Sequence, residues 1–146
     1  MADCMKAASE QLHQLLLDGL GRMVAEEKVP AVPVPSFRVE IPADKSHGDF
    51  AANIAMVSAK AFRMAPRKIA ELLLESISLN GTIFDRAEIA GPGFLNFFLK
   101  QQWFADVAET VLREKEQYGK TQTGAGKRAL VEFVSATPTG TMHVGT

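Results

Sequence analysis

The chain has 146 residues, a formal net charge of −1, and 47% hydrophobic and 23% charged residues. This balance is typical of a folded globular domain and excludes a disordered segment. A net charge near zero also excludes a global field that attracts polyanions, so any nucleic-acid binding must depend on a local patch. Cys4 is the only cysteine, which excludes an intrachain disulfide and a cysteine zinc cluster and favours a reducing compartment. There is no signal-peptide pattern and no apolar run near the roughly 18 residues that span a bilayer, so we expect a cytoplasmic protein without a membrane partner.

An amphipathic helix is predicted near the start of the chain. Its apolar residues recur at helical spacing: Leu12, Leu15, Leu16, Leu20, Met23 and Val24. The three prolines between Val29 and Pro35 end this helix and predict an extended connector. Alternating apolar and charged residues over Phe37–Ile41 then predict a short, half-buried strand.

The middle of the chain predicts a turn followed by two helices. His47-Gly48-Asp49 is the turn, and Asp49 is placed to cap a helix predicted over Phe50–Arg63. Pro66 fits the first position of the next helix, which Asn80-Gly81 closes. One face of that helix carries its apolar residues: Ile69, Leu72, Leu73 and Ile77.

The remaining elements are two strands, a long helix, a linker and a last strand. The strands Phe84–Ile89 and Phe94–Leu99 are joined by Gly91-Pro92-Gly93. The helix covers Gln101–Tyr118, and a glycine-rich linker follows it. The apolar stripe of this helix is expected to be core: Trp103, Phe104, Val107, Val111 and Leu112.

This order of elements predicts an α+β fold, with a small antiparallel sheet packed with helices. We expect a domain over residues 1–118, a linker over 119–128 and a second unit from 129 onward. The second unit begins with a strand over Ala129–Val134 and a Pro-Thr-Gly turn. A strand that leads through a glycine turn toward a helix is how nucleotide-binding α/β domains begin.

Two apparent sites in the sequence are better explained as ordinary structure. His13, His47 and His143 lie on three different elements without metal-ligand spacing, so no metal site is expected. We expect His13 to be solvated and His47 to be structural. Gly124-Ala-Gly-Lys127 lacks the Ser or Thr of a phosphate loop, and a strand follows it instead of a helix.

Two other clusters each allow two interpretations. Lys60, Arg63, Arg67 and Lys68 form a basic cluster that is either a solvated helix face or a set of phosphate contacts. Phe94 and Asn96 share one face of a strand because strand side chains alternate. The pair suits an unpaired base, which would stack on the ring and bond the amide through an adenine edge. Alternatively, Phe94 fills the core and Asn96 lies at a sheet edge.

Five segments together resemble the N-terminal part of bacterial arginyl-tRNA synthetase, in the right order and over most of the chain. They are His47-Gly-Asp-Phe-Ala51, Ile89-Ala-Gly-Pro-Gly-Phe-Leu-Asn-Phe-Phe-Leu99, Val131-Glu-Phe-Val-Ser135, Pro138-Thr-Gly140 and His143-Val-Gly145. The resemblance implies that the region up to Tyr118 is the additional N-terminal domain of this class I synthetase. It also implies that the tail is the first strand and the HIGH-type signature of a truncated Rossmann catalytic domain.

The resemblance assigns roles to single residues. Phe94 and Asn96 match the aromatic residue and the asparagine that meet the D-loop nucleotide at tRNA position 20. Glu132 matches a glutamate that holds arginine, and His143 matches the catalytic histidine that stabilises the triphosphate of ATP. The signature spans Ala136, Thr137, Pro138, Thr139, Gly140, Thr141, Met142, His143, Val144, Gly145 and Thr146. The family has asparagine, proline and histidine at the positions of Thr137, Thr141 and Thr146.

The implied activity belongs to a longer parent protein, which attaches arginine to tRNA(Arg) with ATP and magnesium through an arginyl-adenylate. The sequence contains no second class I signature with its lysine, so we expect the chain alone to be inactive and to hold no cofactor. Its expected role is a tRNA D-loop binding module. The alternative is a standalone or degenerate tRNA-binding protein without catalysis. We also expect the strand Ala129–Val134 to be either disordered or paired with an available sheet edge, including one in another copy.

Overall fold

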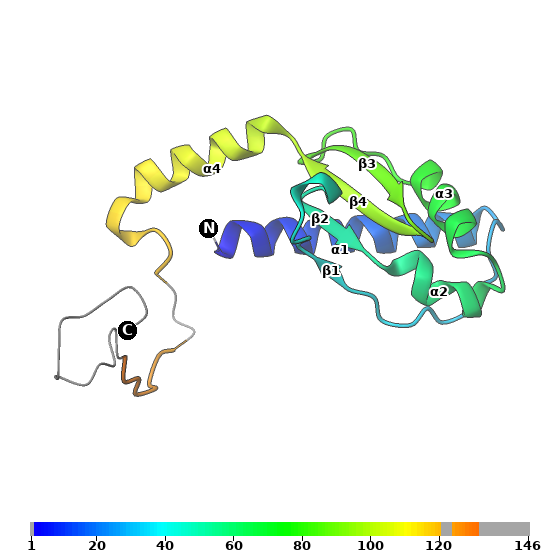
Figure 1. Cartoon of the computed structure of the whole chain (residues 1–146), viewed down its shortest axis with the longest axis horizontal. Coiled ribbons are helices and arrows are strands. Elements are labelled where there is room, and N and C mark those ends of the chain that lie inside the picture. Colours follow the sequence, from blue (N-terminus) through cyan, green and yellow to red (C-terminus); the bar gives the residue numbers. More distant parts are fainter. Residues whose placement is uncertain (1, 121–123, 132–146) are drawn as a thin grey trace, which may run out of the picture.

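The computed structural model describes residues 2–120 and 124–131. Its elements follow one another along the chain, as Figure 1 shows. They are α1 (Ala2–Ala25), β1 (Val39–Glu40), the 3-10 turn η1 (Lys45–His47), β2 (Phe50–Ala52), α2 (Ile54–Phe62), α3 (Pro66–Ser76), β3 (Phe84–Ala90), β4 (Phe94–Leu99), α4 (Gln101–Glu114) and the 3-10 turn η2 (Lys115–Gln117).

The strands form one four-stranded sheet in the order β1-β2-β4-β3, and every neighbouring pair is antiparallel. In Figure 1 the sheet lies in front of α1, with α2 and α3 at one end. These three helices and one face of the sheet share a single hydrophobic core. The predicted α+β fold, a small antiparallel sheet packed with helices, is confirmed.

Aromatic side chains fill the centre of the core. Phe50, Phe84 and Phe97 come from three different strands, and each is no more than 1% exposed. Their rings meet edge to face, with centroids 6.3 Å apart for Phe50 and Phe84 and 5.7 Å apart for Phe84 and Phe97. This arrangement places the positive edge of one ring against the negative face of the next, which adds to the gain from burial.

The first and third helices have the apolar faces that the sequence predicts. On α1 the fully or nearly fully buried residues are Ala8, Leu12, Leu16, Leu20 and Met23. Pro66 lies in the first turn of α3, where its missing N–H costs nothing. The helix α3 ends at Ser76, four residues before the predicted stop at Asn80.

The helix predicted over Phe50–Arg63 is wrong in its first residues. Phe50–Ala52 is strand β2, which pairs with β4, and the helix starts only at Ile54. Asp49 therefore caps no helix. Its Oδ2 accepts a hydrogen bond from the backbone N–H of Leu99 at 2.9 Å. Phe50–Ala52 is a strand because it pairs with β4, which lies some 45 residues away in the sequence. Local helix propensity does not reveal such pairing.

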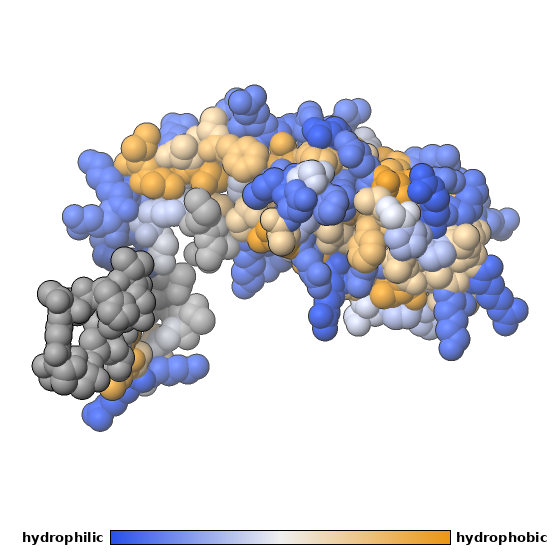
Figure 2. Space-filling model, viewed as in Figure 1, coloured by the Kyte–Doolittle hydropathy of each residue, from blue (hydrophilic) through white to orange (hydrophobic). Residues whose placement is uncertain are grey.

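The expectation that the stripe of α4 is core is wrong for most of its length. Trp103 is partly buried and packs against the core, whereas Phe104, Val111 and Leu112 are exposed. None of the residues of α4 is buried, and Leu112 remains 74% exposed. Figure 1 shows the reason, because α4 extends away from the sheet instead of packing across it. Figure 2 shows apolar side chains along the surface of this helix.

Replacing Leu112 with alanine should therefore change the free energy of unfolding by no more than about 0.5 kcal/mol, as for an exposed position. The matched control is Leu73→Ala in α3, where the side chain is fully buried and the expected loss is about 2–5 kcal/mol. Urea unfolding of both variants measures the difference. A loss at Leu112 comparable to that at Leu73 would contradict the exposed position of α4.

The predicted C-terminal strand lies only partly within the described residues. Ala129, Leu130 and Val131 form no strand in the structure, and residues 132–134 lie outside the described part. Across residues 2–120 and 124–131, no helix is long and apolar enough to cross a membrane.

Candidate nucleic-acid interface

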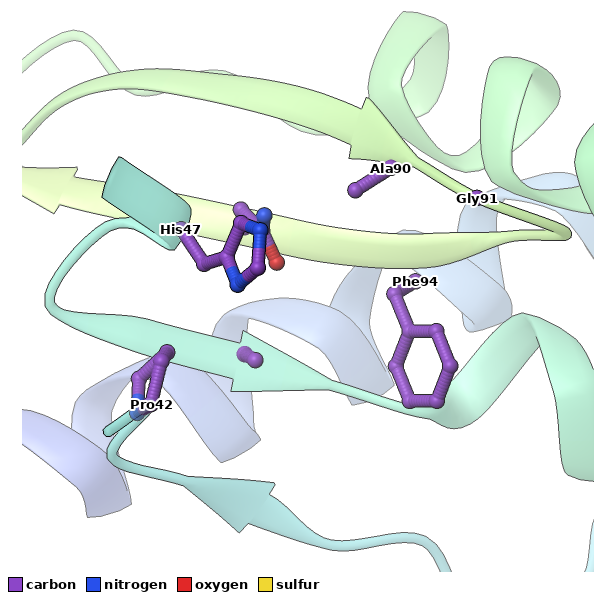
Figure 3. Close-up of a pocket in the computed structure, with 7 residues that line it drawn as sticks. Pro42, His47, Ala90, Gly91 and Phe94 are labelled. Atoms are coloured by element: carbon purple, nitrogen blue, oxygen red, sulfur yellow. The ribbon is translucent and has the colours of Figure 1, made fainter. Parts of the chain in front are cut away.

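A pocket of about 390 Å³ lies on the face of the sheet opposite the core. The residues that line it come from the loop after β1, η1, β2, the end of β3 with its turn, and β4: Pro42, His47, Ala51, Ala90, Gly91, Phe94 and Asn96. Ala51 and Ala90 have small side chains, and both are sheet partners of pocket residues, Asn96 and Phe94 respectively. Figure 3 shows larger side chains around them, with His47 on one side and Phe94 on the other. The pocket therefore forms because the small side chains of Ala51 and Ala90 lie between the larger side chains of His47 and Phe94.

The two residues singled out on β4 lie in this pocket together. Phe94 is 39% exposed, so the core interpretation of its ring is wrong, although Asn96 is only 5% exposed. The turn before them is fixed by Gly93, which has a φ of +142°. A Cβ on Gly93 would lie 2.9 Å from the backbone carbon of Pro66. Only glycine allows α3 to approach this turn so closely.

Asn96 has an amide without a partner in the described part of the chain. Its side chain makes no hydrogen bond to any residue in 2–120 or 124–131. The strand pairs Asn96 with Ala51 on one side and Glu88 on the other, so Asn96 is not at a sheet edge. The residue as a whole is largely buried, but its amide atoms are not fully enclosed and keep access to solvent. The amide faces a pocket and is available to a ligand.

The opposite wall is built by η1 and the turn that follows it. The Asp44 carboxylate accepts a hydrogen bond from the backbone N–H of Ser46 at 2.8 Å, which caps η1. Hydrogen bonds from Ser46 lower the pKa of the Asp44 carboxyl below its ordinary value. The positive charge of the nearby His47 also lowers this pKa, but by less. Gly48, with a φ of +87°, then lets the chain turn back, and the N–H of Asp49 donates to the carbonyl of Phe97 at 2.9 Å. This wall is therefore tied directly to β4.

Part of the predicted basic cluster reaches the edge of the pocket. The Arg67 guanidinium donates to the carbonyl of Gly91 at 3.4 Å. Arg67 and Lys68 also lie 3.9 and 3.6 Å from the Glu71 carboxylate, whose negative charge offsets part of the local positive potential. Lys60 and Arg63 are exposed and form no ion pair with any described residue. The structure thus brings Arg67 to the pocket, while all four side chains remain open to solvent.

Next to the pocket, a carboxylate is held by an arginine. Glu88 is opposite Asn96 on β3, and its Oε1 accepts from Nε of Arg86 at 2.9 Å. The same guanidinium lies 3.6 Å from the centre of the Phe98 ring. A carboxylate beside a polyanion site would repel it, and the contact with Arg86 offsets that charge.

His47 is the pocket residue whose place the sequence did not reveal, since it was expected to be structural. The alternation of side chains along β4 predicts the pair Phe94 and Asn96, but no local pattern shows that the turn near His47 lies against β4. His13, expected to be solvated, is exposed but stacks on Phe37 with ring centroids 4.2 Å apart. Glu132, His143 and the other signature residues lie outside the described residues.

Comparison with known proteins agrees with this fold. Residues 10–99 match the family model described as the arginyl tRNA synthetase N terminal domain. The chain belongs to this family. The match covers most of α1, all of α2 and α3, the whole sheet and every residue that lines the pocket.

Individual relatives extend the similarity over nearly the whole chain. An arginine–tRNA ligase of Acetivibrio thermocellus is 41% identical over 145 residues, which are 99% of this chain and 26% of the relative. One of Magnetococcus marinus is 44% identical over 137 residues, or 93% of this chain and 24% of the relative. The chain therefore spans about a quarter of the length of these relatives.

A solved structure shares the fold. The arginyl-tRNA synthetase of Plasmodium falciparum superposes with a TM-score of 0.52 at 20% identity. The superposition covers 73% of this chain and 18% of that protein. At this identity the likeness concerns the fold alone.

Proposed function

We propose that this domain binds the D-loop of tRNA(Arg) by taking one unpaired base into the pocket on the open face of the sheet. Phe94 stacks on the base, and the amide of Asn96 reads its edge. The observation that carries the proposal is the pairing of a 39% exposed ring with a 5% exposed, unpartnered amide in one pocket. An RNA base supplies the flat apolar face and the polar edge that such a pair requires.

The surroundings of the pocket support RNA over a small apolar ligand. Arg67 lies at its edge, Lys60 and Lys68 lie on α2 and α3, and Arg63 is the C-cap of α2. We propose these four side chains as contacts to the phosphates that flank the bound nucleotide. Because the net charge is only −1, binding should be weak and sensitive to salt.

For the longer protein we propose the activity that its relatives' names describe, the ligation of arginine to tRNA with ATP and magnesium in the cytoplasm. Glu132 would hold arginine and His143 would stabilise the triphosphate. On this proposal residues 1–118 are the tRNA-recognition unit, residues 119–128 are the linker, and residues 129–146 begin the catalytic domain. A standalone tRNA-binding protein would use the same pocket, so the RNA experiment below tests what both alternatives share.

Replacing Phe94 with alanine should weaken binding to tRNA(Arg) by roughly 5- to 150-fold, because base–aromatic stacking contributes about 1–3 kcal/mol. Asn96→Ala should weaken binding less, by roughly 2- to 12-fold for the loss of hydrogen bonds, and should reduce the preference for the base at position 20. Fluorescence anisotropy with the 146-residue chain at fixed, low salt measures both effects.

The matched control is Phe104→Ala, which removes a 47% exposed ring from α4, away from the pocket. This variant should bind as the unaltered chain does. Thermal unfolding of each variant confirms that the domain is folded. Unchanged affinity and unchanged base preference in both Phe94→Ala and Asn96→Ala would refute the proposed function.

A further inference from the structure

We propose that His47 is a second base-reading residue, whose imidazole forms a hydrogen bond with the edge of the base held by Phe94 and Asn96. This inference rests on the proposed function and adds a specificity-determining residue to it. Figure 3 shows the His47 side chain over the open face of the sheet, on the side of the pocket away from Phe94.

The polarity of the pocket lining leads to this assignment. Of the seven lining residues, only His47 and Asn96 have polar side chains; the others are proline, alanine, glycine and phenylalanine. A base that enters such a pocket loses water from its ring nitrogens and exocyclic groups, and each unpaired polar group is costly. One amide supplies a single donor group and a single acceptor group on one side. The imidazole is the side chain available to pair with the remaining edge.

Hydrogen bonds hold the backbone around His47 in place, as is needed for a side chain that binds a ligand in one orientation. Its N–H donates to the carbonyl of Asp44 at 3.1 Å, and the N–H of Gly48 donates to the carbonyl of Lys45 at 3.1 Å. The next residue, Asp49, is bonded to β4 through both its backbone N–H and its carboxylate. β4 also carries Phe94 and Asn96. The backbone of His47 is therefore held in a fixed position relative to these two residues.

The side chain of His47, in contrast, is not committed to a hydrogen bond, although it interacts electrostatically with the Asp44 carboxylate. It is exposed, and it makes no hydrogen bond to any residue of the described ranges. Structural histidines normally use a ring nitrogen to satisfy a neighbour, and His47 does not. A held backbone that carries an imidazole without a hydrogen-bond partner among the described residues, at a pocket, is the arrangement of a ligand-binding residue.

The test crosses three His47 variants with two RNAs. The RNAs are a synthetic tRNA(Arg) and the same molecule with an abasic nucleotide at position 20. His47→Phe keeps an aromatic ring but removes the nitrogens, and His47→Ala removes the ring. Both should weaken binding of the intact tRNA roughly three- to tenfold and leave binding of the abasic tRNA unchanged. His47→Gln, which retains a donor and an acceptor, should stay within about threefold of the unaltered chain.

The matched control is His13→Phe, which keeps the stack on Phe37 outside the pocket and should not alter binding. Equal loss with intact and abasic RNA would make His47 a backbone contact and overturn the inference. So would unchanged binding in His47→Phe and His47→Ala while Phe94→Ala and Asn96→Ala lose affinity, a result that leaves the proposed function intact. If all four variants bind normally, the proposed function fails and this inference fails with it.

Discussion

Replacing Phe97 with alanine should lower the free energy of unfolding by about 3–5 kcal/mol, the range for deleting a buried aromatic side chain. Phe97 is 0% exposed and lies at the centre of the sheet, on strand β4 between β2 and β3. The variant loses the burial of its ring and the edge-to-face contact with Phe84 at 5.7 Å. It also leaves a cavity, because β2 and β3 flank the position and limit how far the surroundings can collapse.

The matched control is Phe98→Ala, one residue along the same strand but on the open face. Phe98 is half-buried, and the Arg86 guanidinium lies over its ring. Its loss should be no more than about 2 kcal/mol, from partial burial and one cation–π contact. Urea unfolding followed by circular dichroism measures both variants. Equal losses would mean that the two faces of β4 are not differently buried.

Replacing Gly48 with alanine should destabilise the domain by about 2–4 kcal/mol. At a φ of +87° an alanine is strained, which costs about 1 kcal/mol or more. The new Cβ would also lie 2.7 Å from the backbone oxygen of Phe97. That oxygen accepts the hydrogen bond of Asp49 and cannot move without disturbing β4, so overpacking adds about 1–3 kcal/mol.

Gly81→Ala separates these two costs. Gly81 has a similar φ of +75°, but nothing lies within 4 Å of the position of its Cβ. Its substitution should cost only the backbone strain of about 1 kcal/mol. A difference between the two variants of less than about 0.5 kcal/mol in urea unfolding would show that Gly48 does not pack against β4 as described.

Phe97 and Gly48 illustrate what a sequence pattern reveals and what it does not. The alternation Phe94, Asn96, Phe98 against Leu95, Phe97, Leu99 predicts the two faces of β4. The same alternation places Phe94 and Asn96 on one face, which is half of the candidate site. The motif His47-Gly48-Asp49 predicts a turn but not its neighbour, because that neighbour is nearly 50 residues away.

The sequence by itself determined the elements whose signals are local. The apolar spacing of α1, the proline that starts α3 and the glycine turn between β3 and β4 all act within a few residues, and the α+β class follows from their order. Only the tertiary structure decided that Phe50–Ala52 pairs as a strand, that most of the stripe of α4 lies in solvent and that His47 faces Phe94 across a pocket. The physical reason is that strand pairing and burial depend on groups far apart in the chain, whose contacts local propensity and periodicity do not encode.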